Sequence, residues 1–384
     1  MSFALSLLIL GTAAEPPIIV TAPRTEQALA ECLARRCGVR EDAITSIRHA
    51  QAQFSDGAYP EARKTLLASL HRNRRANDQD PRALSALWHA LARVTLHNGD
   101  LQEYRRAALR SGSILARSTA VTPSERARGE VQMADALSMT GDPDGAVRGY
   151  RRVGNTARAS GDVELAQIME LRAIYARSTF DGRPAARRAL ERAAQDGTLM
   201  PRARTAALAL AAQLQTRPGA KSEALLNDVP VQPADAPTML LWAPKTSLSE
   251  QREAVNRALA NNDSTLFNLL QPRSSEAKRY SWVDIGFWIR PDGRVEEVEV
   301  LRGSQQQGWT KDVVRSVKGR RYAAFQAGSD ADGRYKIERV TLTFEHQTPS
   351  GSLIRRRTGL PSYRFEELRV EQGGRLTGSP AQAN

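Results

Sequence analysis

The sequence predicts a multidomain protein, with an all-α helical-repeat solenoid over residues 26–228 and a small α+β domain over residues 249–346. The prediction rests on a repeat with a period of about forty residues, a proline-rich stretch after it, and a change from helical to alternating periodicity near residue 280. Alanine, leucine and arginine dominate and aromatic residues make up only 5%, which is typical of packed helices and disfavours a sheet-only fold.

Regularly spaced glycines, flanked by small or acidic residues, mark the repeat. They stand at Gly57, Gly99, Gly141, Gly182 and Gly219, at steps of 42, 42, 41 and 37 residues. A period of this size predicts stacked helical hairpins. Behind the turns, the second helix carries a small residue where it crosses the first and a larger residue one turn later. The pairs are Ala62 and Leu66, Ala146 and Tyr150, and Ala186 and Leu190, with the order exchanged at Tyr104 and Ala108.

This spacing resembles that of tetratricopeptide (TPR) repeats, in the Gly-Asp turns and in the alanine and tyrosine behind them. The resemblance implies a divergent array with longer links between hairpins, because the usual period is about 34 residues. A stacked array leaves a concave groove that binds extended or helical segments, so protein or peptide partners are expected. The histidines of this half stand singly, and no metal site or cofactor is predicted.

Residues 1–14 have the pattern of a cleavable signal peptide. The apolar run over residues 3–10 is too short to cross a bilayer, and the small residues after it suit cleavage after Ala14. We therefore predict a periplasmic location, a mature chain without a transmembrane helix, and an extended segment at residues 15–25. No Lys or Arg precedes the apolar run, which leaves a buried N-terminal strand as the alternative.

Cys32 and Cys37 are candidates for a disulfide in an exported chain. In an unbroken helix a five-residue step rises about 7.5 Å, beyond the usual limit of about 7 Å between bridged Cα atoms. Gly38 offers an end for the helix, which lets Cys37 bend back towards Cys32. The alternative is two separately packed thiols.

Three prolines mark residues 229–248 as a linker. A short helix is expected from Ser249 to Asn261, with Ser247 and Glu250 in capping-box positions. The tail at residues 347–384 is expected to be mostly disordered, although residues 362–370 can form one more extended piece.

Between these segments the pattern predicts the order strand, strand, helix, strand. The elements are expected at residues 280–290, 294–301, 308–318 and 335–344. The Pro-Asp-Gly sequence at 291–293 turns the first strand into the second, and the adjacent Glu296 and Glu297 indicate a bulge. In the last strand Arg339, Thr341 and Thr343 share one face, opposite an apolar face.

These elements resemble the C-terminal domain of the TonB energy-transducer family, over residues 275–346. The matching pieces are the Pro-Asp-Gly-Arg-Val turn, the Arg-Arg-Tyr after the helix, and the final alternating strand. The resemblance implies a domain that grips an extended segment, the TonB box of an outer-membrane receptor, by adding it as a strand beside the last strand. Carried over to this chain, it implies partner contacts at Arg339, Thr341 and Thr343.

Three departures separate the chain from a transducer. Where a transducer has a membrane anchor, this chain shows only a short apolar run with the pattern of a cleavable signal. A helical array stands in place of the Pro/Lys-rich spacer, and Gln271-Pro272 keeps only the beginning of a Gln-Pro-x-Tyr-Pro-like segment. A binding module is therefore predicted. Residues 17–24 themselves resemble a TonB box, and could add to an edge strand of this protein or of a similar one; the alternative is a disordered N-terminus.

The leading functional prediction is a non-enzymatic periplasmic or envelope interaction protein, linked to TonB-dependent transport. No Gly-x-Ser-x-Gly, P-loop, His-Glu-x-x-His or dinucleotide-binding pattern is found, which disfavours an enzyme. The net charge of +13 suggests the alternative, a basic protein that binds a polyanion or nucleic acid, or an anionic envelope surface.

Overall fold

The computed structural model describes residues 22–76, 79–178, 183–214, 226–260, 280–304, 308–328, 333–347 and 356–368. The predicted signal peptide lies outside these ranges, as do residues 17–21 of the segment that resembles a TonB box. Residues 22–25 are helical, so the prediction of an extended conformation for them is wrong. No helix in the described ranges is both long enough and apolar enough to cross a membrane.

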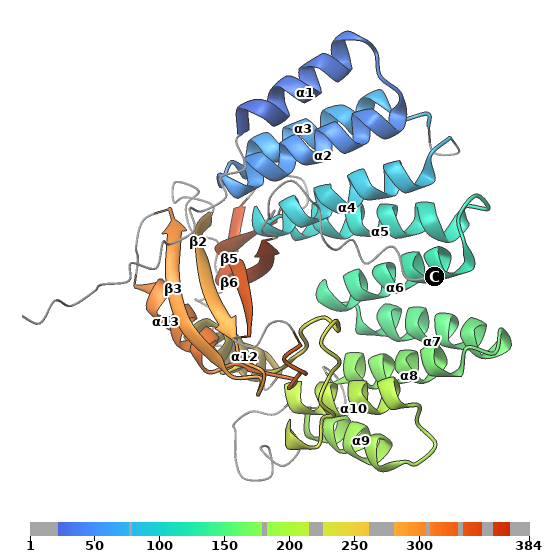
Figure 1. Ribbon diagram of the computed structural model, residues 1–384, viewed down its shortest axis with the longest axis vertical. Helices are drawn as coiled ribbons and strands as arrows, with labels where there is room; N and C mark the ends of the chain where they lie inside the picture. Colours follow the sequence, from blue (N-terminus) through green and yellow to red (C-terminus); the bar gives the residue numbers. More distant parts are fainter. Residues whose placement is uncertain are drawn as a thin grey trace, which may run out of the picture.

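Helices make up the N-terminal part and stack along the long axis of the molecule (Figure 1). They are α1 (Ala22–Ala34), α2 (Val39–Ser55), α3 (Tyr59–Arg72), α4 (Pro81–His97), α5 (Leu101–Arg117), α6 (Pro123–Met139), α7 (Pro143–Ala159), α8 (Val163–Arg177), α9 (Arg183–Gln195) and α10 (Pro201–Gln213). The predicted helical-repeat solenoid is confirmed by this architecture.

The turn glycines join the two helices of each hairpin. Gly57 lies between α2 and α3, Gly99 between α4 and α5, and Gly141 between α6 and α7, with φ values of +76°, +77° and +81°. A residue with a side chain is strained at such angles, which is why the repeat keeps glycine there. The predicted crossing residues behind the turns are all buried. Gly182 and Gly219 lie outside the described residues.

The aspartate that follows two of these glycines caps the second helix. Asp100 accepts a hydrogen bond from the backbone N–H of Glu103 at 2.9 Å, and Asp142 accepts one from Gly145 at 2.8 Å. Capping explains in physical terms why Gly and Asp recur together at the turns.

The first helices of successive hairpins also contact one another, α2 with α4 and α8 with α10. No comparable contact joins the second helices of successive hairpins in the described array. We call these helices, α3, α5, α7 and α9, its outer layer.

The proline-rich segment is folded onto the C-terminal part, so its assignment as a free linker is wrong. Its strand β1 (Leu240–Trp242) pairs antiparallel with β4 (Arg321–Tyr322). Leu241 is 1% exposed and packs with the apolar side chains of α9 and α10. The segment thus ties the last helices of the array to the sheet domain.

The helix after this segment, α12 (Ser247–Ala260), starts two residues earlier than expected. Thr246, and not Ser247, caps it: the Thr246 hydroxyl accepts a hydrogen bond from the Ser249 backbone N–H at 3.2 Å. The Ser247 hydroxyl instead donates to Asp312 in α13 (Trp309–Lys318), at 2.8 Å.

A four-stranded antiparallel sheet forms the centre of the C-terminal domain, with strand order β3-β2-β5-β6. Its strands are β2 (Tyr280–Ile289), β3 (Val295–Gly303), β5 (Arg334–Gln347) and β6 (Arg356–Leu368). Helix α13 covers one face, where Val313 and Val317 pack against the apolar side chains of β2. The expected strand, strand, helix, strand order is present. The tail was expected to be mostly disordered, with one extended piece at residues 362–370. Strand β6 covers that piece as far as Leu368 and begins before it, at Arg356, so the expectation of disorder is wrong for residues 356–361.

The other face of the sheet packs against the turns of the first two hairpins (Figure 1). The described part of the C-terminal domain therefore contacts the array at α2–α5 through the sheet and at α10 through β1. This arrangement decides which surfaces of the sheet remain open to a partner.

Candidate protein-binding site

The three residues predicted to bind a partner do not lie on an open strand edge. Arg339, Thr341 and Thr343 are each 0% exposed. Strand β6 pairs with β5 along their length, with Thr341 opposite Arg364 and Thr343 opposite Ser362. The chain itself thus occupies the edge at which strand addition was expected, and the assignment of these residues to partner binding is corrected.

Arg339 instead joins the sheet to the array. Its guanidinium forms a two-pronged ion pair with Asp284 at 2.5 and 2.8 Å, and donates to the backbone carbonyls of Phe54 and Ser55 at 2.5 and 2.6 Å. It also stacks on the ring of Trp282, 3.7 Å from its centre. Arginine suits this place because its planar fork satisfies several acceptors at once.

Thr341 is held by two side chains of the array. Tyr59 Oη lies 2.9 Å from its hydroxyl, and His97 Nδ1 lies 2.7 Å from it. Burial lowers the pKa of His97, although Glu366 on β6 opposes the shift from 3.7 Å away. The neutral imidazole therefore belongs to the packed interface.

The turn glycines are docking points for the sheet as well. A Cβ at Gly57 would overlap the indole of Trp282, and a Cβ at Gly99 would overlap Thr343 and the backbone of β5. The Tyr280 hydroxyl donates to the Gly57 carbonyl at 2.9 Å. At Gly141, by contrast, nothing lies close. The turns at Gly57 and Gly99 therefore both join the helices of a hairpin and contact the sheet.

Strand β6 is itself anchored to the array, because Glu366 forms an ion pair with Arg93 of α4. Burial alone would raise the pKa of Glu366, but its contacts with His97 and Arg93 hold it below the usual value. The closing strand is therefore an integral part of the interface.

A groove lies on the opposite side of the domain, between β3 and α13. Its volume is about 670 Å³, and it is lined by Val300, Gly308, Thr310, Lys311, Val314, Arg315 and Lys318. We refer to these residues as the α13–β3 groove.

The groove combines a cationic rim with an apolar strip. Lys311, Arg315 and Lys318 lie at steps of four and three residues, which places them on one face of α13, and all three are exposed. Val300 is 39% exposed beside them. Of these three cations, only Arg315 has an ion pair with a described residue, Asp312 at 3.8 Å, so the rim keeps most of its charge available.

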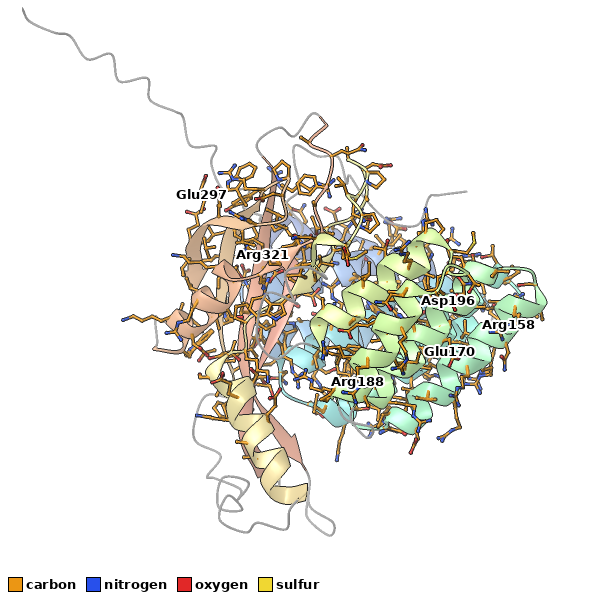
Figure 2. The ribbon with its side chains drawn as sticks, turned by 90° about the horizontal axis from the view of Figure 1, so that it is seen from below. Arg158, Glu170, Arg188, Asp196, Glu297 and Arg321 are labelled. Atoms are coloured by element: carbon orange, nitrogen blue, oxygen red, sulfur yellow. A yellow bond between two sulfur atoms is a disulfide. The ribbon has the colours of Figure 1, made fainter. Side chains whose placement is uncertain are left out.

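Strand β3 is the free edge beside this groove, and it is irregular. Its register with β2 shifts twice, and Glu297 has a φ of +51° at one of the shifts. This confirms the predicted bulge, and Glu297 lies at the rim of the sheet (Figure 2). Bulges disfavour the pairing of a further strand. The groove therefore suits a partner bound through its side chains.

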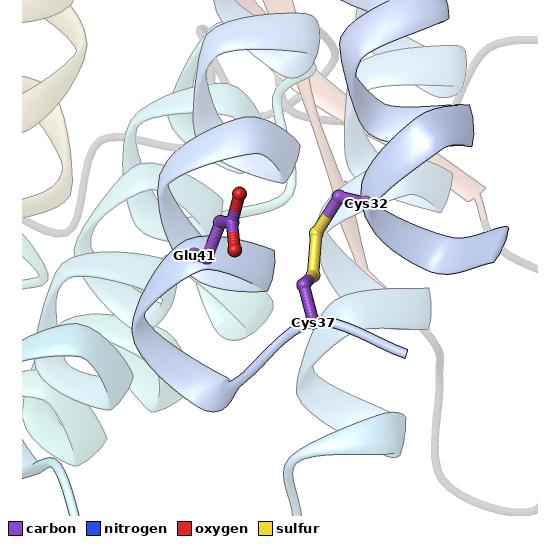
Figure 3. A group of neighbouring side chains, drawn as sticks. All are labelled: Cys32, Cys37 and Glu41. Atoms are coloured by element: carbon purple, nitrogen blue, oxygen red, sulfur yellow. A yellow bond between two sulfur atoms is a disulfide. The ribbon is translucent and has the colours of Figure 1, made fainter. Parts of the chain in front are cut away.

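The cysteines form a disulfide, with their Cα atoms 5.1 Å apart. The helix ends at Ala34, and Arg36, with a φ of +51°, turns the chain back, whereas Gly38 is the N-cap of α2. The two sulfurs and a Glu41 oxygen lie within 4.8 Å of one another (Figure 3). Bridged sulfurs are not thiolate ligands, so this group does not fit a metal ion in its oxidised form.

No protein-family model matches the chain, and no curated protein matches it. Several solved structures are similar in part, and two of them serve as examples. TPR-like repeats assigned to a kinesin light chain of Podosopora anserina are 20% identical, with coverage of 44% of this chain and 82% of that one and a TM-score of 0.38. BtubC (BKLC) from P. vanneervenii is 14% identical, with coverage of 68% and 94% and a TM-score of 0.39. The repeat architecture of this chain rests instead on its own hairpins.

Proposed function

We propose that the protein is a non-enzymatic interaction scaffold whose α13–β3 groove binds an acidic polypeptide segment. The observation that carries this proposal is the placement of three exposed cations beside the exposed Val300 and the half-buried Val314 in one groove. The helical array packs against one face of the sheet, and β6 covers the edge of β5. Among the described residues of the C-terminal domain, the α13–β3 groove is a concave surface that stays open to a partner.

The chemistry of the groove favours a partner with acidic and apolar side chains together. Carboxylates would pair with Lys311, Arg315 and Lys318, and an apolar side chain would cover Val300 and Val314. Exposed ion pairs contribute little to affinity on their own, so the apolar contact has to supply much of the free energy. A volume of about 670 Å³ holds a few side chains and is within the usual range for ligand sites.

Catalysis is not part of the proposal, because the buried acids have structural partners. Asp284 pairs with Arg339, Asp42 with Arg72, and Glu338 with Arg320. Such pairs hold elements together, and we assign these three carboxylates a structural role.

We place the protein in the bacterial envelope and keep the link to TonB-like proteins as part of the proposal. The apolar run at residues 3–10 supports export, and the disulfide suits an oxidising compartment. Fusing residues 1–40 to a reporter that is active only after export tests the location. Reporter activity that depends on residues 1–14 supports the envelope location. An inactive fusion contradicts it, and so does a fusion that stays active after residues 1–14 are deleted.

Selection of peptides from a random library on the full-length protein tests the groove. We expect enriched peptides that combine Asp or Glu with a large apolar residue. They should bind at least tenfold more weakly to the variant Lys311→Glu/Arg315→Glu/Lys318→Glu.

A matched control changes the same amount of charge on exposed arginines of three first helices, Arg48→Glu/Arg128→Glu/Arg202→Glu. Peptides that bind the groove should keep their affinity for this control. Equal losses in the two variants would show that net charge, and not the groove, recruits them.

A further inference from the structure

Positive charge is concentrated on the outer layer of the array. The second helices α5, α7 and α9 each carry four arginines and a single acid. Among the first helices, α2 and α8 carry two arginines and two acids each, α6 carries two arginines and three acids, and α4 and α10 carry two arginines and no acid. Basic and acidic residues are interspersed along the sequence, but in the folded array the excess of basic residues lies mainly on the second helices.

The exposed cations recur at the same place in successive hairpins. Counted from the turn position, at Gly57, Gly99, Gly141 and Asp181, the seventh residue is always basic, and the eleventh is an arginine in the last three hairpins. These positions hold Lys64, Arg106, Arg110, Arg148, Arg152, Arg188 and Arg192, which we call the basic ladder, and all seven are exposed. Figure 2 labels Arg188, which lies on α9.

Helix geometry explains why the ladder points outward. The fifth and ninth residues after each turn are buried, and the seventh lies two residues from each of them. Two residues correspond to about 200° around a helix, which is the opposite side. The seventh and eleventh residues are one turn apart and share that outer side.

The ladder differs from the arginines beside it, which hold the hairpins together. At the sixth residue after the turn, Arg63 pairs with Glu103 at 2.6 Å and Arg105 with Asp142 at 3.1 Å, both in the next hairpin. Within the described ranges, Arg152 is the ladder residue with an ion pair, to Glu130 at 3.2 Å. The other ladder cations are therefore available to a partner.

We propose that the basic ladder binds a linear chain of phosphate groups, of the inorganic polyphosphate type, laid along the stacking axis across α3, α5, α7 and α9. Guanidinium groups match phosphate oxygens in charge and in two-pronged hydrogen-bond geometry. A row that crosses successive helices fits a linear ligand with charges repeated along it. This inference is independent of the α13–β3 groove.

The surroundings of the ladder disfavour two other anionic partners. Among the described residues of α3, α5, α7 and α9, no large apolar or aromatic side chain is exposed. Bases of a single-stranded nucleic acid stack on aromatic side chains, and membrane-bound helices insert apolar ones.

Calorimetric titration of the full-length protein with polyphosphate of defined length, at several salt concentrations, tests the ladder. The affinity should fall steeply with salt, with a logarithmic slope of about −5 if all seven cations meet phosphates. The variant Arg106→Gln/Arg148→Gln/Arg188→Gln should bind at least tenfold more weakly, with a slope of about −3. The control Arg48→Gln/Arg128→Gln/Arg202→Gln removes the same charge from first helices, and should bind as the wild type does.

Equal losses in the two variants would overturn the inference, because net charge alone would then explain binding. Absence of polyphosphate binding would overturn it too. Tighter binding of an oligothymidine or of phosphatidylglycerol vesicles than of polyphosphate would show that the partner is wrong. Retention of groove-selected peptides by the ladder variant would separate this site from the groove.

Discussion

Replacement of Arg339 by methionine tests whether the sheet and the array form one folded unit. The change removes a fully buried guanidinium from Asp284, which is itself 1% exposed, and from two carbonyls at the end of α2. Asp284 would keep Arg302, at 2.8 Å, as a half-exposed partner. Breaking a buried ion pair from one side costs about 3–5 kcal/mol of unfolding free energy, because the remaining charge stays buried. We expect a loss in that range.

Urea unfolding followed by circular dichroism measures this loss. The slope of the unfolding free energy against urea concentration should be the same in the variant and in the wild type, which checks two-state behaviour. The double variant Asp284→Leu/Arg339→Met removes both charges and should regain most of the stability. The control Arg290→Met removes a partly exposed arginine that pairs with Glu296 at the rim of the same sheet, and should change little. If Arg339→Met costs no more than Arg290→Met, the interface described above does not hold the protein together.

Three further changes test separate parts of the structure. Gly141→Ala should cost about 1–3 kcal/mol of stability through its positive φ, and Gly99→Ala should cost about 1–3 kcal/mol more because its Cβ also meets β5; equal costs in thermal unfolding would argue against docking at the turns. Burial lowers the pKa of His97, so on acidification the unfolded chain binds the proton at a higher pH than the folded chain does. The free energy of unfolding should therefore fall below about pH 6.5, by about 1.4 kcal/mol per pH unit. In urea unfolding, His97→Gln should lack this part of the pH dependence, and an unchanged dependence would contradict the role given to His97. Reduction of the Cys32–Cys37 disulfide should cost about 2 kcal/mol at most, since it closes a short loop, and should speed hydrogen exchange in α1 alone; faster exchange across the array would contradict a local role.

The hairpins were predictable because their signals are local. A turn that needs a positive φ selects glycine, a helix start selects aspartate, and a crossing point selects a small residue, all within about ten residues of one another. The strands and α13 were predictable for the same reason, from alternation and from the turn at Gly293, whose φ is +80°.

The role of β5 was not predictable from its own pattern. Polar residues at every second position, such as Arg339, Thr341 and Thr343, are typical of a strand face that is exposed to solvent. Here that face is covered by the array: Tyr59 and His97, the partners of Thr341, lie more than 240 residues earlier in the chain. Periodicity describes which residues share a face and carries no information on what covers it.

Strand β6 was predicted only in part, as an extended piece at residues 362–370, and the basic ladder was missed. Arg356, Arg357 and Pro361 make β6 look like a solvated tail, and it is ordered by pairing with β5 and by the ion pair between Arg93 and Glu366. The ladder is present in the sequence, but at a period of about forty residues it emerges only when each arginine is counted from its turn. The α13–β3 groove had no signal beyond the basic face of one short helix.

Mapping where a bound peptide lies is the most direct test of the central claim. A library-selected peptide carrying a photo-crosslinker should attach to residues 295–303 and 309–318 of the full-length protein, as read by mass spectrometry. Attachment to residues 356–368, or displacement of that strand from β5, would show that partners enter through the edge that the protein itself closes, and would contradict the account.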